Sequence, residues 1–494
     1  MELAQKLTEG LERLFAEGRV EVRENGARLG AMEGFGYQVR QQGDLVLLHL
    51  WGSERNLVRR ILRVAAEEAG LLALETMRLG RSRPDRLEFV AADNFPRTPA
   101  EVIRDAFQTR FRDLLTQQFP DEQIVSLTNK ADLKHSLSGN YARAILERDS
   151  RTWAVLGTAP GESAATHDAL LTFGLLWLDR TRESPRSKSV AGLRLFFPAD
   201  AGRVTKHRLQ ALSRSTTVEL YEYSVDTWRA RLVDPQDTGN WETWLAPRRE
   251  AEAILAEARP AVEHIQSLAP GIMEAEWIPG TREVALRFRG LIFARWTRAG
   301  VFYGAGDPQQ PLTADRQADF ERLVKDLETY RSPVSTATKH ALYRAQSERW
   351  LETMVAGDLG RIDARLDTRF LYKQVPALSA GDRSVMDLIG VTRSGRLAVV
   401  ELKVAEDPHL ALQAVDYWLR VRWHHAQQDF SRYGYFPGII LDTRPPLLYL
   451  VAPAIRFHSA TDIVLRYLSD EIEICRVGVS EHWRRGLKVV LRHG

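Results

Sequence analysis

One strand-like segment of this chain carries charges where a buried strand would have none. Residues 396–404 read RLAVVELKV, so Glu401 and Lys403 interrupt an otherwise apolar run. Buried charges are costly unless they are paired or bound to a metal ion. Because alternate residues of a strand point to the same face, the two charged side chains share one face. Such a local departure from the apolar pattern of a buried strand marks a candidate functional site.

A second apolar segment lies just upstream and supplies a third charged residue. Residues 384–391 read SVMDLIGV, and residues 392–395, Thr-Arg-Ser-Gly, are a hairpin signal between the two segments. In an antiparallel hairpin with this loop, Asp387 comes close to the strand end that carries Glu401. We therefore expect two carboxylates and a lysine to gather where the strand leaves the sheet.

These residue types suit the cleavage of phosphodiester bonds. The hard carboxylate oxygens of Asp387 and Glu401, together with the carbonyl oxygen of Leu402, can hold one Mg²⁺ (or Mn²⁺) ion that keeps several waters. A metal ion there polarises a phosphate and lowers the pKa of a bound water. Lys403 can orient that water and stabilise the negative charge of the transition state.

The order of these residues resembles a known nuclease family. Asp387 followed by Glu401-Leu402-Lys403 is similar to the D…ExK motif of the PD-(D/E)xK nuclease superfamily. Gln413 and Tyr417, one turn apart on the next predicted helix, are similar to the Q-x-x-x-Y motif of its RecB-like branch. The resemblance covers about 150 of the 494 residues. It implies a Mg²⁺-dependent deoxyribonuclease with a restriction-endonuclease-like mixed sheet flanked by helices, and with these catalytic residues: Asp387, Glu401, Lys403, Gln413 and Tyr417.

Members of this family often take one more acidic residue from the helix upstream. The pattern of residues 339–357 predicts such a helix, which offers Glu348 and Glu352. Glu348 lies about 40° from the centre of the apolar stripe and Glu352 about 80°, at about 100° per residue, so we prefer Glu348. RecB-like members also often carry a metal-binding histidine. His340 is the one candidate on this helix, and we interpret it as a surface histidine.

The length of 494 residues predicts several domains, because a single core stops growing well below this size. Two prolines in residues 94–99 predict a linker, and Arg331-Ser332-Pro333 predicts a second break. We therefore expect a multidomain α/β fold with four parts: an N-terminal α/β domain (1–95), a second α/β domain (100–246), a helix with β-hairpins (247–332) and the nuclease-like domain (335–494).

A basic segment stands out in the first part. Residues 53–69 have the pattern of a helix, on which Arg55, Arg59 and Arg63 would form one stripe. Such a stripe could lie along a phosphate backbone. It could equally be a solvated face that pairs with neighbouring glutamates.

Residues 141–198 repeat the pattern of the nuclease-like domain without its charges. One interpretation is a degenerate, catalytically inactive copy of the same fold, which would bind substrate, pair with the active copy or act as a scaffold. The other is that strand–helix–strand units of any α/β protein look alike. When residues 153–156 are aligned with residues 397–400, Arg143 lies opposite Asp387, Gly157 opposite Glu401 and Ala159 opposite Lys403. After a slip of three residues, Thr172 lies opposite Gln413 and Trp177 opposite Trp418.

Aromatic residues and histidines follow the Q-x-x-x-Y pair. We interpret Trp418 as a core residue, because the predicted helix must bury one face. His424 and His425 come at its end, and we expect both to be exposed.

The cysteine content and the hydropathy of the chain indicate its cellular compartment. Cys475 is the only cysteine, so an intramolecular disulfide and an iron–sulfur cluster are both excluded. No apolar run approaches the roughly 20 residues needed to cross a bilayer, and the N-terminus reads as an amphipathic helix rather than a signal peptide. We expect a cytoplasmic protein with no membrane contact.

The partner that these features favour is nucleic acid, with DNA expected and RNA left open. The net charge of +3 neither demands nor excludes such a partner. A homodimer or a protein partner is a further expectation. The alternative function is a catalytically silent nucleic-acid-binding or scaffold protein of a repair or defence complex, for which salt-sensitive binding without metal-dependent turnover would argue.

Overall fold

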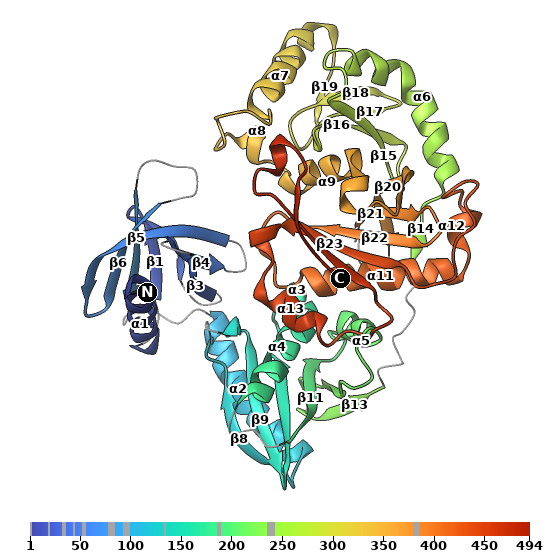
Figure 1. Ribbon diagram of the computed structural model, residues 1–494. Helices are drawn as coiled ribbons and strands as arrows, with labels where there is room; N and C mark the ends of the chain where they lie inside the picture. Colours follow the sequence, from blue (N-terminus) through green and yellow to red (C-terminus); the bar gives the residue numbers. More distant parts are fainter. Residues whose placement is uncertain are drawn as a thin grey trace. The chain divides into compact units, whose positions relative to one another are not determined.

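The structure is a computed structural model. In it the chain forms two compact units. The first unit is Met1–Gly239 with Asp462–Tyr467, and the second is Asn240–Thr461 with Leu468–Gly494. Figure 1 shows the helices and strands of both. The structure describes residues 2–17, 20–31, 36–42, 45–51, 56–77, 84–91, 99–132, 135–184, 189–234, 243–378 and 385–494. The predicted linker at residues 94–99 lies outside these ranges except for its last residue.

The first unit begins with helix α1 (Glu2–Glu17), whose apolar stripe covers an antiparallel sheet. Leu7, Leu11 and Leu14 of this stripe recur at helical spacing and are buried against the strands. The strand order is β2-β1-β7-β6-β5-β4-β3. The strands are β1 (Val20–Glu24), β2 (Ala27–Ala31), β3 (Gly36–Gln42), β4 (Leu45–Trp51), β5 (Asn56–Glu68), β6 (Leu71–Met77) and β7 (Asp85–Ala91).

The helix predicted for residues 53–69 is wrong, because Asn56–Glu68 is the strand β5. It pairs with β4 on one side and β6 on the other. Its pairing with β6 is irregular at two places, between Ile61 and Arg63 and between Val64 and Ala66. Each irregularity shifts the alternation of apolar residues, and the shifted pattern imitates the spacing of a helix.

The basic stripe expected on that helix is therefore absent from the described part of β5. Arg59 is buried, and its Nε donates to Glu24 Oε1 at 2.7 Å. The Nε of Arg63 donates to Glu75 Oε2 at 2.5 Å. Arg55 lies outside the described residues. Both described arginines are thus engaged within the sheet.

A second sheet of the first unit has the order β13-β12-β11-β10-β9-β8. Helix α2 (Pro99–Gln118) precedes it, and its central strands are β9 (Tyr141–Arg148), β10 (Arg151–Thr158) and β11 (Ser189–Pro198). Helix α4 (Leu170–Glu183) connects β10 to β11. The remaining elements are β8 (Gln123–Thr128), α3 (Ala164–Asp168), α5 (Arg203–Leu209), β12 (Val218–Tyr223) and β13 (Ala230–Val233).

The sheet of the nuclease-like region belongs to the second unit and has the order β14-β20-β21-β22-β23-β24-β25. Its centre is the predicted hairpin, β21 (Val385–Thr392) and β22 (Leu397–Leu402), followed by α11 (Leu410–Ala426), which lies along β22 and β23 (Figure 1). The other elements are β14 (Trp244–Leu245), α9 (Ser347–Gly357), α10 (Leu359–Ile362), β20 (Leu366–Leu378), α12 (Asp429–Arg432), β23 (Leu447–Pro453), α13 (Ser459–Leu465), β24 (Ile474–Val479) and β25 (Val489–His493).

These two sheets share one topology. The strand pairs β8–β9 and β9–β10 are antiparallel, as are β20–β21 and β21–β22. The next two pairs are parallel in both sheets, and the last pair is antiparallel in both. A long helix, α4 or α11, lies between the first two parallel strands, and each connection also holds a short helix, α3 or α12. This repetition supports the interpretation of residues 141–198 as a second copy of the nuclease-like fold.

The strand register corrects one position of the expected alignment. Ala142 pairs with Gly157, whereas the pairing of Leu388 with Val400 places Asp387 opposite Glu401. If Gly157 corresponds to Glu401, then Ala142, and not Arg143, corresponds to Asp387. The two hairpins close with different turns, and the register shifts by one residue.

In the second sheet of the first unit, a ring fills the position that corresponds to Glu401. A Cβ atom at Gly157 would lie 2.6 Å from the Cζ atom of Phe111, which comes from α2 and is fully buried. Ala159, which corresponds to Lys403, is fully buried in the same apolar cluster. This sheet of the first unit thus has an apolar core at the positions where the sheet of β21 and β22 has charges.

We expect Gly157→Ala to destabilise the first unit by about 2 kcal/mol, because the added methyl group forces the Phe111 ring out of its place. Urea denaturation followed by near-ultraviolet circular dichroism measures this loss. An unchanged denaturation midpoint would show that the ring does not fill this position.

A further antiparallel sheet of the second unit lies between residues 273 and 311. Its order is β15-β16-β17-β18-β19, and helices α6 and α7 pack on it, as the sequence predicts for residues 247–332. The elements are α6 (Arg248–Gln266), β15 (Met273–Ile278), β16 (Glu283–Phe288), β17 (Leu291–Thr297), β18 (Gly300–Tyr303), β19 (Gln310–Pro311) and α7 (Gln317–Tyr330).

The single helix expected over residues 339–357 is two helices, α8 (Ala341–Arg344) and α9 (Ser347–Gly357). Gln346 between them has a left-handed backbone, with a φ of 43°. The cause is Arg331, which is fully buried and donates to backbone carbonyl oxygens around the break. Its Nη1 donates to Leu342 O at 2.8 Å and to Ala345 O at 2.6 Å. Carbonyl groups that a continuous helix would use internally bind the guanidinium instead.

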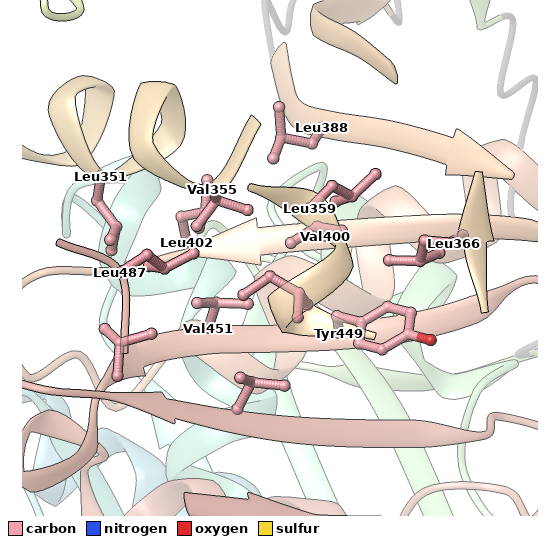
Figure 2. Close-up of a cluster of buried hydrophobic side chains, with 14 of the residues drawn as sticks. Leu351, Val355, Leu359, Leu366, Leu388, Val400, Leu402, Tyr449, Val451 and Leu487 are labelled. Carbon is pink, nitrogen blue, oxygen red and sulfur yellow. The ribbon is translucent and has the colours of Figure 1, made fainter. Parts of the chain in front are cut away.

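After this break in the chain, α9 and α10 cover the apolar core of the sheet that contains β21 and β22. Leu351, Val355 and Leu359 point from these helices toward Val400 and Leu402 of β22 (Figure 2). All five side chains are buried, so the start of α9 is held firmly against the end of β22. No helix in the described part of the chain is long and apolar enough to cross a membrane.

Candidate functional site

The predicted carboxylate pair forms at the ends of β21 and β22. Asp387 and Glu401 are 7% and 1% exposed, and they belong to neighbouring strands in register. The Oδ2 atom of Asp387 accepts the backbone N–H of Leu402 at 3.0 Å. The N–H of Lys403 donates to Val451 O at 3.0 Å, on the other side of the strand. Because the N–H and C=O of one strand residue point to the same side, the Leu402 carbonyl faces the Asp387 side.

Glu401 is an incompletely satisfied buried acid. Its Oε2 atom finds no hydrogen-bond partner among the described residues. Burial raises the pKa of Glu401 well above its ordinary value, and the neighbouring Asp387 carboxylate raises it further. A buried acid of this kind requires a cation or a proton to be stable.

Lys403 lies among three carboxylates. Its Nζ atom is 3.8 Å from Glu401 Oε1 and 3.7 Å from Glu348 Oε2. Asp407 Oδ2 lies 4.0 Å away. Burial lowers the pKa of Lys403, but these carboxylates outweigh burial and the net shift is upward. The lysine therefore stays charged at neutral pH.

Helix α9 adds two acids and one arginine to the same cluster. Glu348 Oε2 lies 3.7 Å from Lys403 Nζ, while Glu352 is buried one turn later. Between them Arg349 donates from Nη1 to Asp387 Oδ1 at 2.9 Å and to Glu352 Oε2 at 2.5 Å. Burial raises the pKa of Glu352 to about 8 in spite of this arginine. Both candidate acids of the helix thus reach the cluster.

Sequence reasoning missed Arg349. Its adjacency to Glu348 and its spacing of three residues from Glu352 were visible signals, since such pairs meet on one helix face. What the sequence did not contain was the direction of α9, which points Arg349 at Asp387.

The Q-x-x-x-Y pair lies next to the cluster on α11. Gln413 Nε2 donates to the Tyr417 hydroxyl at 3.3 Å. Burial raises the pKa of Tyr417, and the nearby Glu401 and Asp387 carboxylates raise it further. The hydroxyl therefore keeps its proton and lies within electrostatic reach of both acids.

Other candidates lie elsewhere. His340 stacks on Tyr330, with ring centroids 3.8 Å apart, and its Nδ1 accepts the N–H of Leu342. Trp418 is fully buried, as expected, and its Nε1 donates to Pro446 O. These contacts give both residues structural roles.

The expected exposure of His424 is wrong, because only 1% of this residue is exposed. Its Nδ1 lies 2.8 Å from Asp429 Oδ2, and its Nε2 contacts the hydroxyl of Thr243. Asp429, just beyond the end of the helix, and Thr243, far away in the sequence, cover the ring, and the periodicity of the helix alone does not show them. His425 is half-buried, with its Nε2 at 2.8 Å from Asp442 O.

This arrangement predicts loss of stability in acid. Burial lowers the pKa of His424 below the ordinary value of 6.5, although Asp429 opposes this shift. The unfolded chain therefore takes up a proton more readily than the folded chain. We expect the free energy of unfolding to fall as the pH drops below about 6.5. Urea denaturation at pH 7.5 and 5.5 should show a smaller difference for His424→Asn than for the unsubstituted protein, and an equal difference would contradict this account.

The donor set fits a divalent cation with an incomplete protein shell. Within the described ranges, no three His, Cys, Asp or Glu side chains gather as a metal-binding group. Two carboxylates do converge, one with an unpartnered oxygen, beside the Leu402 carbonyl. Mg²⁺ commonly binds through one or two carboxylates and keeps its remaining ligands as water or substrate phosphate. Asp387, Glu401 and Leu402 meet that requirement.

A cavity of about 500 Å³ lies beside the cluster. The start of α9 provides one wall, and the hairpin of β16 and β17 with the residue after Lys403 provides the rest. Three of the seven residues in this lining are charged; the lining consists of Arg287, Ile292, Gln346, Ser347, Glu348, Arg349 and Val404. Space for a substrate group therefore exists next to Lys403.

Comparisons with known proteins add little to this geometry. No protein-family model and no curated protein matches the chain. Among solved structures, a repair endonuclease from Pyrococcus abyssi is similar over 45% of this chain and 95% of its own, at 9% identity and a TM-score of 0.16. A TM-score this low does not establish a shared fold.

Proposed function

We propose that residues 335–494 are a metal-dependent nuclease domain that cleaves phosphodiester bonds of nucleic acid, with DNA as the expected substrate. The observation that carries this proposal is the buried pair of Asp387 and Glu401, with Lys403 Nζ 3.8 Å from Glu401. Charges concentrated at the end of an apolar strand destabilise a fold, so their presence indicates a ligand.

Each residue of the cluster has a role in this proposal. Asp387, Glu401 and the Leu402 carbonyl would hold Mg²⁺ or Mn²⁺, which when bound polarises the phosphate and acidifies a water. Lys403 binds the attacked phosphate and stabilises its extra negative charge. Glu348 holds Lys403 in place at 3.7 Å.

The Q-x-x-x-Y pair supports the acids from the other side. Gln413 fixes the hydroxyl of Tyr417 at 3.3 Å, close to Glu401 and Asp387. In this proposal the two residues orient the buried carboxylate and shield it from bulk water. The upstream copy, whose corresponding position holds the Phe111 ring, binds substrate or acts as a scaffold.

A catalytically silent nucleic-acid-binding or scaffold protein is the second candidate, and one observation favours it. Arg349 already engages Asp387 at 2.9 Å, as an ordinary ion pair would. Salt-sensitive DNA binding without any turnover would support this candidate. A homodimer or a protein partner in a repair or defence complex is compatible with either function.

Cleavage assays with Mg²⁺, with Mn²⁺ and with EDTA test the proposal on plasmid and oligonucleotide substrates. We expect cleavage only with a divalent ion, and a loss of about 10²-fold in rate for Lys403→Met. Lys488→Met is a matched control, because this lysine is exposed and far along the chain from the cluster. Equal activity of the Lys403 and Lys488 variants would remove the assignment.

A further inference from the structure

Arg349 forms an ion pair with Asp387, one of the carboxylates that the proposed function assigns to a metal ion. Its Nη1 atom bonds Asp387 Oδ1 at 2.9 Å, while Asp387 Oδ2 accepts the Leu402 N–H at 3.0 Å. Both oxygens of Asp387 are therefore engaged. The same Nη1 atom bonds Glu352 Oε2 at 2.5 Å, so the guanidinium bridges two buried acids.

A divalent ion and this guanidinium cannot share Asp387 at low cost. Like charges repel strongly in a partly buried site, where the effective dielectric is well below that of water. Metal binding at Asp387 and Glu401 therefore requires Arg349 to move away from Asp387. If Arg349 stays, the affinity for the metal ion is lower. The site contains two alternative counter-ions for one carboxylate.

The structure provides a place for the withdrawn side chain. Arg349 itself lines the cavity of about 500 Å³, together with Ser347 and Glu348 at the start of α9 and with Arg287 of β16. Its side chain is 28% exposed, so it already reaches the open space. A rotation of its side-chain torsions, without movement of α9, transfers the guanidinium from Asp387 into the cavity.

The chemistry of this cavity suits a phosphate. It begins beside Lys403, since Val404 and Glu348 line it and Glu348 Oε2 lies 3.7 Å from Lys403 Nζ. A guanidinium binds phosphate oxygens in a two-pronged geometry that a lysine cannot offer. Once the Arg349 side chain has left Asp387, it would thus contact the phosphate group next to the one that is cleaved.

We propose that Arg349 is a displaceable counter-ion: it holds Asp387 and Glu352 together while no divalent ion is bound, and it turns into the adjacent cavity to bind a backbone phosphate when one is. This inference rests on the proposed function. It makes Arg349 a positioning residue for substrate, and it predicts opposite effects of one substitution on metal binding and on nucleic-acid binding.

Calorimetric titration of the full chain with MnCl₂, without nucleic acid, tests the first effect. We expect Arg349→Gln to bind Mn²⁺ about tenfold more tightly than the unsubstituted protein, because the competing charge is gone. Arg349→Lys keeps the charge and should stay within about twofold. Arg361→Gln, which removes an exposed arginine that pairs with Asp358 three residues earlier, is the matched control and should bind like the unsubstituted protein.

Fluorescence anisotropy with a labelled oligonucleotide and Ca²⁺ tests the second effect. Arg349→Gln should bind the oligonucleotide about fivefold more weakly, and the Arg361 variant should not. Unchanged or weaker Mn²⁺ affinity of Arg349→Gln, with normal binding by the unsubstituted protein, overturns the inference and leaves the proposed function standing. No Mn²⁺ binding by the unsubstituted protein overturns both.

A measurement on the unsubstituted protein covers the case in which Arg349→Gln does not fold. Nuclear magnetic resonance of arginine guanidinium groups detects slow exchange when a side chain is held by buried carboxylates. We expect a protected Arg349 signal in EDTA that disappears on saturation with Mg²⁺. A signal that persists unchanged at saturation contradicts the displacement.

Discussion

Replacing Glu401 by glutamine is expected to lower the rate of nucleic-acid cleavage by about 10³-fold and to make the protein more stable in EDTA at pH 8. The loss of activity follows from the removal of a negatively charged oxygen that the proposed site requires. The gain in stability follows from the cost of burying that charge, because Glu401 is 1% exposed and its Oε2 atom has no hydrogen-bond partner in the described residues.

The stability gain should depend on pH with a definite sign. Burial and Asp387 raise the pKa of Glu401 in the folded protein above the ordinary value of 4.5. The native carboxyl therefore destabilises the fold increasingly as the pH rises above about 4.5, whereas glutamine does not titrate. We expect thermal melting in EDTA to show Glu401→Gln about 5 °C more stable at pH 8 and nearly equal at pH 4.

Glu471→Gln is a suitable control, because this glutamate is exposed and pairs with Arg422 at the surface. It should change neither activity nor melting temperature. A Glu401→Gln variant that is inactive and also less stable at pH 8 would indicate that Glu401 holds the fold together. That outcome would contradict the assignment of a functional, destabilising charge.

Replacing Arg331 by methionine is expected to reduce the free energy of unfolding of the second unit by about 4 kcal/mol. Arg331 is fully buried, and each of the partners described for its guanidinium is a backbone carbonyl oxygen. Burial, the largest cause, lowers its pKa to about 9, and two neighbouring arginines add to this shift. Methionine fills much of the volume but leaves several buried carbonyl groups without a donor.

The same substitution should also affect the site. Arg331 fixes the break between α8 and α9, and its Cζ atom lies 4.7 Å from the ring centroid of Trp350 in α9. Loss of these contacts frees the start of the helix that carries Glu348 and Arg349. We expect lower activity even at low temperature, where the variant remains folded.

Urea denaturation of Arg331→Met measures the loss of stability, and Arg322→Met is the control. Arg322 lies in α7, the helix that ends just before Arg331, but it is 72% exposed and pairs with Asp319 at the surface. Its replacement should leave the midpoint unchanged. If both variants lose the same small amount, the carbonyl contacts of Arg331 do not stabilise the break between the helices.

The hairpin and its charges could be predicted because they depend on local signals. Alternation of apolar residues fixes the faces of β21 and β22, and a short turn ending in Gly395 fixes their pairing. From this register alone Asp387 must lie opposite Glu401. The apolar stripe of the upstream helix was a poorer guide, because it places Glu348 nearer its centre than Glu352, whereas Glu352 is buried and the side chain of Glu348 is 41% exposed.

Features that depend on distant residues could not be predicted in the same way. The break before α9 is made by Arg331, which arrives from the end of another helix. His424 has the spacing of an exposed helix end, but Asp429 and Thr243 cover it. The orientation of Arg349 toward Asp387 follows from the break and has no pattern of its own. In each case tertiary contacts override a local preference.

The most direct test of the central claim is a crystal of the full chain soaked in MnCl₂ and examined by anomalous scattering. The account predicts one strong peak within about 2.5 Å of carboxylate oxygens of both Asp387 and Glu401, with Arg349 turned away from Asp387. Two results would contradict it. One is no anomalous peak at Asp387 and Glu401, with Arg349 still bonded to Asp387. The other is a peak that lies only at other acidic residues.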